Sequence, residues 1–397
     1  MDNLDIEREI EQVKDELISW RRYLHQNPEL SFKEYNTTRF ICNLLESFHC
    51  GFILEKPTKT GVVARLKGDD PGKTVLYRAD IDALPIHEKN RLSYTSQNDG
   101  VMHACGHDGH TAILLAVAKI LGRHRESLKG EVRFVFQPAE EVGGARSILN
   151  TGILSGVDQA FALHLWSPLE TGKYGIVYGP AMAAGEAFDI EIDGKGGHAG
   201  KVNETIDPVN IAVSVISTVN QFINRCVDPI APRALSVTYF HGGSSHNVIP
   251  DFVKFGGTIR ALDRDTLEKI KSGLVEVLDN IDHLYHSTYT LHFETDGLPD
   301  GEPPSLPVVN DRKATALVEQ AIEKYLGSDK IVHLKPTLAG EDFAFYSHYV
   351  PAGFIFVGTK NVRKGTDYPH HSPFFNLDED SLAEGVALFL SISKEIV

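Results

Sequence analysis

A group of side chains that commonly bind metal ions is spread over the first half of the 397-residue chain. The group combines a thiol, imidazoles and carboxylates: Cys105 and His107 in MHACGHDGH, Glu140 and Glu141 in QPAEE, and His164 in ALHLW. Sulfur, nitrogen and oxygen ligands together suit Zn²⁺, Mn²⁺, Co²⁺ or Ni²⁺ better than the all-oxygen sites of Mg²⁺ and Ca²⁺. The sequence therefore predicts a site for a divalent transition metal.

The consecutive glutamates indicate hydrolytic chemistry. One carboxylate can bind metal while its neighbour, pointing elsewhere, takes a proton from metal-activated water. A nucleophilic mechanism has less support, because the chain has no G-X-S-X-G sequence and Cys105 has no evident base and orienting partner. Taken singly, His164 could be a core histidine and Glu141 a residue in the first turn of a helix, so the prediction depends on their joint occurrence.

These residues are expected at the strand ends of an α/β domain. Short apolar segments at 61–68, 73–80, 131–140 and 159–166 are typical of strands, and a helix is predicted at about 107–124. The alternation of strands and helices indicates a largely parallel sheet. Such sheets place their functional residues at the carboxyl ends of the strands.

From 186 to 295 the pattern changes and predicts a separate, inserted domain. Its elements run in the order β-α-β-β-α-β, with helices at 207–227 and 264–285, which is the order of a ferredoxin-like α+β unit. The first domain is then expected to comprise residues 1–185 and 296–397. Two glycine-rich segments of the insert, GKGGHAG and HGGSSHN, lack the spacing of nucleotide-binding motifs and are interpreted as turns.

Amino-acid composition limits the classes of binding partner and the cellular compartment that are expected for this chain. The 54 acidic and 39 basic residues give a formal net charge of −15, which disfavours nucleic acid and anionic lipid as partners. Four cysteines are too few for a disulfide scaffold, and the charged N-terminus lacks an apolar signal core, so a cytoplasmic location is expected. No apolar run approaches the roughly 18 residues of a membrane span, so no membrane partner is expected.

Ten short segments resemble, in order, those of one metallohydrolase family. They are HQNPELSFKEY, RADIDALP, MHACGHDGHT, QPAEE, ALHLW, GKGGHAG, NVIPD, GTIRAL, AGEDFAF and HHSPFFNLDE. Their order is similar to that in the amidohydrolase branch of the aminoacylase and carboxypeptidase G metallopeptidase family. This branch includes hippurate hydrolases, N-acyl-amino-acid deacylases and auxin-conjugate hydrolases, and the resemblance covers nearly the whole chain.

The resemblance implies a zinc-peptidase-like α/β catalytic domain interrupted by a smaller ferredoxin-like domain that serves as dimerisation and lid domain. It also implies two divalent metal ions, Zn, Mn, Co or Ni, in each subunit of a homodimer or homotetramer. Glu140 would be the general base. Carried over by motif, the metal ligands would be Cys105, His107, Glu141, His164 and His371.

Three residues of the insert acquire roles by the same resemblance. His198 of GKGGHAG would donate a hydrogen bond to the oxyanion that forms in the site of the partner subunit. Asn247 of NVIPD and Arg260 of GTIRAL would recognise the free α-carboxylate of the substrate. The alternative for Arg260 is an ordinary charge pair on the surface of a strand.

One position departs from the other branches of the family. Arg78 stands where those branches carry a metal-binding histidine two residues before an aspartate, which here is Asp80. The amidohydrolase branch shares the change, and it leaves the role of that aspartate open. His103, His110 and His370 are interpreted as residues that orient ligands or stabilise the fold.

The predicted reaction is hydrolysis of the amide bond of N-acyl-L-amino acids, a class of small-molecule substrate. Water activated by the metal pair would lose its proton to Glu140, which then passes it to the leaving amine. Asp108 is the next candidate for the base. Two alternatives stay open: a dipeptidase or carboxypeptidase of the same family, and a catalytically silent metal-binding member, because a fold does not fix a function.

Overall fold

The computed structural model describes residues 1, 4–296, 298 and 305–397, and the chain forms two compact units. The first unit comprises Met1–Gly179, Val308–Lys335 and Asp342–Val397, and the second comprises Pro180–Pro307 and Pro336–Glu341. Among the described residues, no helix is both long enough and apolar enough to cross a lipid bilayer.

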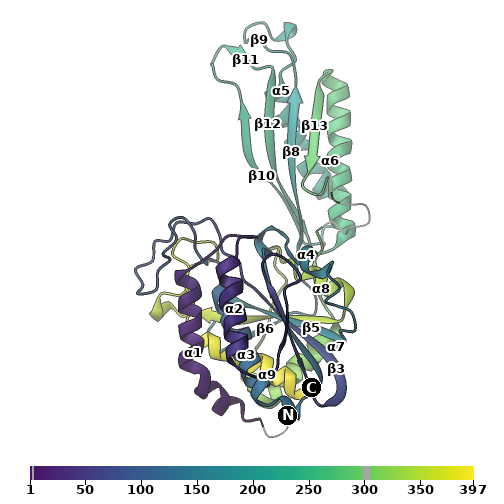
Figure 1. Cartoon of the computed structure of the whole chain (residues 1–397). Helices are drawn as coiled ribbons and strands as arrows, with labels where there is room; N and C mark the ends of the chain where they lie inside the picture. Colours follow the sequence, from purple (N-terminus) through teal and green to yellow (C-terminus); the bar gives the residue numbers. More distant parts are fainter. Residues whose placement is uncertain (2–3, 297, 299–304) are drawn as a thin grey trace. The chain divides into compact units, whose positions relative to one another are not determined.

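An eight-stranded mixed sheet forms the centre of the first unit (Figure 1). In spatial order its strands are β1 (Ile53–Glu55), β2 (Val62–Lys67), β4 (Lys129–Gln137), β3 (Asp70–Asp80), β5 (Gln159–Glu170), β16 (Ala352–Lys360), β6 (Tyr174–Ile176) and β15 (Ile331–His333). The central strands β4, β3, β5 and β16 run parallel. By contrast, β1 pairs antiparallel with β2, β2 with β4, and β6 with β16. The predicted α/β class is confirmed, and the predicted parallel order holds at the centre of the sheet.

The described part of the first unit contains seven α-helices, most of which share one hydrophobic core with this sheet. They are α1 (Ile6–Gln26), α2 (Tyr35–Ser47), α3 (His107–Arg123), α4 (Ala145–Leu149), α7 (Arg312–Tyr325), α8 (Ala344–Tyr349) and α9 (Asp380–Ile396). The start of α1 is capped by Asp5, which accepts a hydrogen bond from Arg8 N–H, and its apolar side chains repeat on one buried face. Helix α3 packs against both α1 and α9 and shares their core.

The carboxyl ends of two central strands lie side by side. β3 ends at Asp80 and β4 at Gln137, and these residues are partners in the parallel ladder. After β3 a loop leads to α3, whose first residue is His107, and after β4 the chain turns at once into a short 3-10 turn, Glu140–Val142. The fold thus brings residues of separate sequence motifs to one edge of the sheet, as expected for parallel strands.

The second unit is a four-stranded antiparallel sheet with two helices (Figure 1). Strands β10 (Arg233–Gly242), β12 (Phe252–Ala261), β8 (Ala184–Asp193) and β13 (Thr288–Phe293) lie in this order, and α5 (Pro208–Cys226) and α6 (Arg264–Tyr285) pack on β8 and β12. The predicted β-α-β-β-α-β order is confirmed. The two glycine-rich segments meet in a short ladder between β9 (Gly197–His198) and β11 (Val248–Ile249). The described residues also form strands β7 (Gly179–Met182) and, in the first unit, β14 (Val308–Asn310).

The second unit is larger than the insert predicted at 186–295. It begins at Pro180, and residues 336–341 return to it late in the chain. Backbone hydrogen bonds hold this returning segment, because Ala183 N–H donates to Ala339 O at 2.9 Å and Thr337 N–H donates to Ala181 O at 3.0 Å. Pairing between segments so distant in the sequence leaves no local periodic signal.

Candidate metal centre

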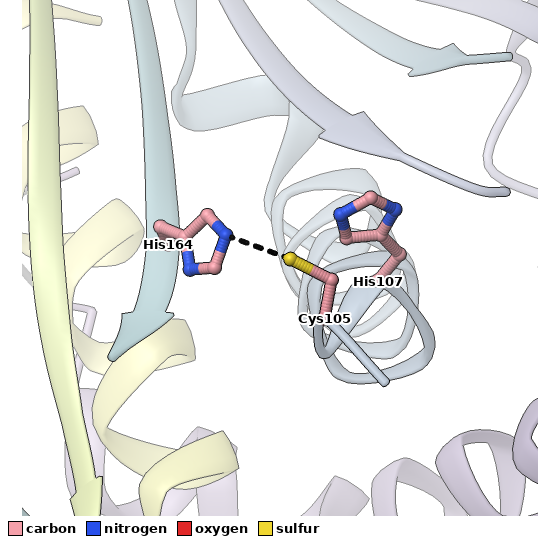
Figure 2. Close-up of side chains that lie close together, drawn as sticks. All are labelled: Cys105, His107 and His164. Atoms are coloured by element: carbon pink, nitrogen blue, oxygen red, sulfur yellow. Dashed lines mark hydrogen bonds between the residues drawn. The ribbon is translucent and has the colours of Figure 1, made fainter. Parts of the chain in front are cut away.

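Cys105, His107 and His164 lie together at the start of α3 and on β5 (Figure 2). The Cys105 Sγ atom is 3.5 Å from His164 Nε2. One possible ligand atom of each residue lies within 4.8 Å of those of the other two, and both histidines are buried. Sulfur and imidazole nitrogens at this spacing form a donor set that a divalent transition metal can bind.

Glu141 and His371 extend the cluster. Together with Cys105 they form a second group whose ligand atoms lie within 4.8 Å of one another, and Glu141 Oε1 is 3.4 Å from His371 Nε2. His371 has a φ of +64°, a left-handed conformation that residues other than glycine rarely adopt. Its N–H donates to Ala104 O at 2.8 Å, which ties this residue to the Cys105 loop. Backbone strain of this kind is typical of functional sites.

Two buried atoms of the cluster have no hydrogen-bond partner within the described part of the chain. They are His107 Nε2 and Glu141 Oε1. Buried polar atoms nearly always find a partner, and divalent ions bound here would satisfy both of these. The five residues predicted as ligands therefore lie together and fit a metal site by their chemistry, and their role as ligands stays a prediction.

Asp82 orients His107. His107 Nδ1 lies 3.0 Å from the Asp82 backbone oxygen and 3.1 Å from Asp82 Oδ1, so Nδ1 carries a hydrogen and Nε2 would be the nitrogen that binds a metal ion. Asp82 Oδ2 accepts hydrogen bonds from Ser31 Oγ at 2.7 Å and from Glu141 N–H at 3.2 Å. Burial alone would raise the pKa of Asp82, but the hydrogen bond and the charge of His107 lower it, so the carboxylate is ionised.

Arg78 lies outside the ligand cluster and pairs with two carboxylates. Its buried guanidinium donates to Asp80 Oδ2 and to Asp342 Oδ1, each at 2.7 Å. Asp80 Oδ1 in turn lies 2.6 Å from His110 Nδ1, and His110 Nε2 accepts from Leu165 N–H at 2.9 Å. Both ring nitrogens of His110 are thus bonded within the protein, so His110 is a positioning residue. Asp80, whose role the sequence left open, thus contacts both Arg78 and His110.

Asp108, the alternative base, is closed off from solvent. It is fully buried, and its Oδ2 accepts from Arg21 Nε and lies within hydrogen-bond distance of His25 Nδ1, both at 2.8 Å. Burial alone would raise the pKa of this carboxyl group, but the charge of Arg21 and the bond with His25 lower it. A buried carboxylate held in this way is suited to a structural role, so Glu140 is the better candidate for the base.

His103 and His370 have different surroundings. His370 lies 3.3 Å from Ser167 Oγ through Nδ1 and 2.9 Å from Leu165 O through Nε2, which is a structural arrangement. His103 is buried, and neither of its ring nitrogens has a hydrogen-bond partner among the residues described. Burial lowers the pKa of His103 to about 4, so this ring is neutral at neutral pH.

The protonation states of two predicted ligands differ. Burial raises the pKa of the Cys105 thiol well above its usual value. Burial, together with the imidazoles of His110 and His370, holds the pKa of His164 well below its usual value, so His164 is neutral. Metal ions bind the thiolate and the neutral imidazole, so binding at Cys105 would release a proton while His164 is ready to bind.

Glu140 lies beside the cluster and keeps some exposure to water. Its Oε2 is 3.9 Å from His107 Nε2, and its side chain is 12% exposed. Its Oε1 accepts from Asp342 N–H at 3.3 Å. The Asp342 carboxylate is itself held by Arg78 and by Gln137 Nε2, the latter at 2.8 Å. Sequence reasoning assigned Asp342 no role, although it lies in the motif AGEDFAF.

His198 lies on β9 in the second unit, where it pairs with Val248 and is exposed. Its Nδ1 accepts a hydrogen bond from Gly200 N–H at 3.0 Å. Because an acceptor nitrogen carries no hydrogen, this bond places the ring hydrogen on Nε2. The outward-facing imidazole can therefore act as a hydrogen-bond donor.

Asn247 and Arg260 lie at opposite ends of the sheet of the second unit. The Asn247 carbonyl accepts from Ala199 N–H at 3.0 Å, beside the β9–β11 ladder. Arg260 is near the end of β12 and pairs with Gly185, where a side chain would collide with the guanidinium. Asn247 lies just before β12, which begins at Phe252. The eight residues from Phe252 to Arg260 span about 25 Å along the strand, so Asn247 and Arg260 of one unit are far apart.

Residues 76–395 match peptidase family M20/M25/M40, and the chain belongs to this family. Over 293 residues it is 46% identical to an N-acyl-L-amino acid amidohydrolase of Geobacillus stearothermophilus, an alignment that covers 73% of this chain and 79% of the relative. It is 37% identical over 386 residues to thermostable carboxypeptidase 2 of Saccharolobus solfataricus, covering 96% and 95% of the two chains. The family predicted from the ten motifs is confirmed.

The fold agrees with a solved relative. A Bacillus subtilis protein described as a dinuclear metal binding peptidase of the M20 family superposes with a TM-score of 0.81 at 35% identity, covering 96% of this chain and 98% of that one. The fold class expected from the sequence, an α/β catalytic domain with an inserted α+β domain, is thereby confirmed. Membership of a peptidase family also confirms a hydrolase that acts on amide bonds.

Proposed function

We propose that this chain is a metal-dependent amidohydrolase that removes the acyl group of N-acyl-L-amino acids. The observation that carries the proposal is the position of Glu140, whose Oε2 lies 3.9 Å from His107 Nε2. That nitrogen is buried and has no hydrogen bond among the described residues. A base beside a metal-binding atom is the arrangement that hydrolysis by activated water requires. The relative with 46% identity is named for this substrate class.

Two ions of Zn²⁺, Mn²⁺, Co²⁺ or Ni²⁺ are proposed for each subunit. All five proposed ligands fall into two groups of ligand atoms that share Cys105, which is consistent with two neighbouring ions. When bound, such ions supply polarisation of the scissile carbonyl and acidification of water. The proposed ligands are Cys105, His107, Glu141, His164 and His371.

Glu140 is the proposed general base. It takes a proton from the attacking water and returns it to the amine that leaves. Its Oε2 lies on the His107 side, 3.9 Å from Nε2, and is the proposed atom that receives the proton, while Oε1 accepts a hydrogen bond from Asp342 N–H. Asp342 accepts a hydrogen bond from Arg78, so the buried guanidinium helps to orient the base.

His198 is the proposed donor to the oxyanion. Its Nε2 carries the ring hydrogen, because Nδ1 accepts from Gly200 N–H. We assign the second unit to dimerisation, so that the exposed β9–β11 ladder of one subunit reaches the site of its partner. A single donor aimed at the developing negative charge is worth about 10² to 10³ in turnover.

Asn247 and Arg260 are proposed to bind the free α-carboxylate of the substrate. Because about 25 Å of strand separates them within one unit, a single carboxylate would be bound by Arg260 of one subunit and by Asn247 of the other. His198 is likewise proposed to act in the site of the partner subunit, and Asn247 lies directly beside the ladder that contains His198.

The remaining assignments of the proposal concern location and assembly. We place the protein in the reducing cytoplasm as a homodimer or homotetramer, with no nucleic acid or membrane partner. The net charge of −15 and the four cysteines, all free, support this placement.

A carboxypeptidase is the second candidate function, since a relative covering 96% of the chain carries that name. A panel of substrates separates the two. After chelation and reloading with Mn²⁺, Zn²⁺, Co²⁺ or Ni²⁺, we expect kcat/KM for the best N-acyl-L-amino acid to exceed that for any dipeptide by at least about tenfold.

Chelation alone should abolish this hydrolysis, because both activation of water and polarisation of the carbonyl are lost. Faster cleavage of the dipeptides would favour the peptidase. Failure to cleave either class with any of the four metals would favour a catalytically silent metal-binding member of the family.

A further inference from the structure

The loop of residues 28–34, here called the α1–α2 loop, lies against the strand ends that carry the metal centre. Its residues PELSFKE belong to a motif to which the reaction assigns no part. Leu30 pairs with Ala83 in an isolated parallel bridge, and Ala83 N–H donates to Glu29 O at 2.9 Å. One side chain of the loop, Ser31, donates to Asp82, which in turn orients His107. The loop is therefore fixed beside the cluster by backbone and side-chain contacts.

Glu34, the last residue of this loop, contacts the turn that holds Glu140. Glu34 is fully buried, and its Oε1 accepts a hydrogen bond from Ala139 N–H at 2.8 Å. Ala139 is the residue directly before Glu140 and is itself buried. Glu34 stands at the N-cap position of α2, but its side chain does not cap that helix. The carboxylate is thus used for a contact with a segment 105 residues away.

The backbone at Ala139 needs such a contact. Ala139 has a φ of +57°, a left-handed conformation that is unfavourable for any residue with a Cβ atom. Its carbonyl accepts from Gly144 N–H at 2.7 Å and from Val142 N–H at 3.2 Å. With its N–H bonded to Glu34, both polar groups of this strained residue are held.

Two glycines, Gly61 and Gly144, pack closely against Pro138, the residue before Ala139, and so restrict the movement of this turn. A Cβ atom on Gly61 would lie 2.7 Å from Pro138 Cδ, and one on Gly144 would lie 2.3 Å from Pro138 O. Both distances are far shorter than a van der Waals contact, so the turn is closely packed by backbone. A change in the conformation of Ala139 would therefore displace the glutamates that follow it.

We propose that Glu34 is a positioning residue that holds Glu140 and Glu141 in place through the N–H of Ala139. The inference rests on the proposed function for the roles of the two glutamates. Its physical basis is the strain at Ala139, which the hydrogen bond from its N–H to a buried acceptor helps to offset. Glu34 itself does not touch the ligand cluster.

Two substitutions of Glu34 test this role. Glu34→Met fills a similar volume but has no acceptor for Ala139 N–H, and we expect kcat to fall by about 10- to 100-fold, the scale of a displacement near 1 Å. KM should change by less than about threefold, because the proposed substrate-binding residues are untouched. Glu34→Gln keeps a carbonyl oxygen at the acceptor position and should restore most of the turnover.

A second readout does not depend on activity. In the Co²⁺-loaded protein, the visible absorption spectrum reports the geometry of the metal ligands. Glu34→Met should change this spectrum or weaken Co²⁺ binding by at least about tenfold, because Glu141 moves with the turn, whereas Glu34→Gln should match the parent.

Glu29→Gln is the matched control. Glu29 lies in the same loop, and its side chain accepts from the N–H groups of Asn36 and Thr37 at the start of α2. This variant should lose thermal stability yet keep the kcat and the Co²⁺ spectrum of the parent.

The inference is overturned if Glu34→Met, once folded and loaded, has the turnover and the Co²⁺ spectrum of the parent. A lowered melting temperature alone, with both readouts unchanged, would make Glu34 merely structural. If the parent hydrolyses no N-acyl amino acid, the proposed function fails, but the Co²⁺ spectra still decide the role of Glu34.

Discussion

Replacing Glu140 by glutamine should lower kcat by about 10² to 10⁴ and leave the metal content of the protein unchanged. The substitution preserves shape and keeps an oxygen that can accept from Asp342 N–H, so the side chain should stay in place. It removes the ability to take up a proton. Elemental analysis and steady-state kinetics on the same purified sample measure both quantities.

The neighbouring residue offers a control of identical chemistry. Glu141→Gln should instead lose bound metal, and activity with it, because Glu141 Oε1 lies in the ligand group with Cys105 and His371. A loss of less than about tenfold in kcat for Glu140→Gln would move the base elsewhere. If Glu140→Gln loses metal and Glu141→Gln does not, then Glu140 is the metal ligand and Glu141 is the base.

Replacing His198 by alanine should lower turnover by about 10² to 10³, the usual effect of removing one oxyanion donor. His198 is exposed and its ring bonds only locally, to Gly200 N–H, so the variant should fold, dimerise and bind metal like the parent. Kinetics, metal analysis and size-exclusion chromatography together separate loss of chemistry from loss of structure.

Mixed dimers decide whether His198 acts across subunits. An inactive Glu140→Gln chain co-assembled with an inactive His198→Ala chain should regain part of the activity. One site of such a heterodimer combines an intact Glu140 with an intact His198 from the other chain. If heterodimers are shown to form and no activity returns, the cross-subunit role is wrong.

The grouping of Cys105, His107, Glu140 and Glu141 could be predicted from the residues because their chemistry is restrictive and they lie near the ends of predicted strands, whereas His371 entered only through the family resemblance. His107 begins a helix after β3, and Glu140 and Glu141 follow β4, so the rule for parallel strand ends places them together. The edge strands were less predictable. Antiparallel pairing of β1 with β2 depends on partners that a local pattern does not specify.

His110 was expected to be an orienting residue, but the long-range contacts of Ser31 and Asp342 could not be predicted. Ser31 contacts Asp82 across 51 residues, and Asp342 contacts Glu140 across 202 residues. A single serine, aspartate or glutamate has no periodic signal, and a long-range hydrogen bond follows from the packing of elements rather than from spacing. The separation of Asn247 from Arg260 likewise required the register of β12 against β8.

The central claim is that two bound metal ions are needed for hydrolysis, and measuring activity as a function of the number of bound ions tests it most directly. Protein stripped by chelation is titrated with Mn²⁺ while hydrolysis of an N-acyl-L-amino acid and bound metal are measured in the same samples. We predict that activity rises with bound metal and reaches its plateau at about two ions per chain, and that Cys105→Ala binds fewer ions and stays far less active. Full hydrolysis by protein that holds only trace metal, or a Cys105→Ala variant that binds and turns over like the parent, would contradict the account.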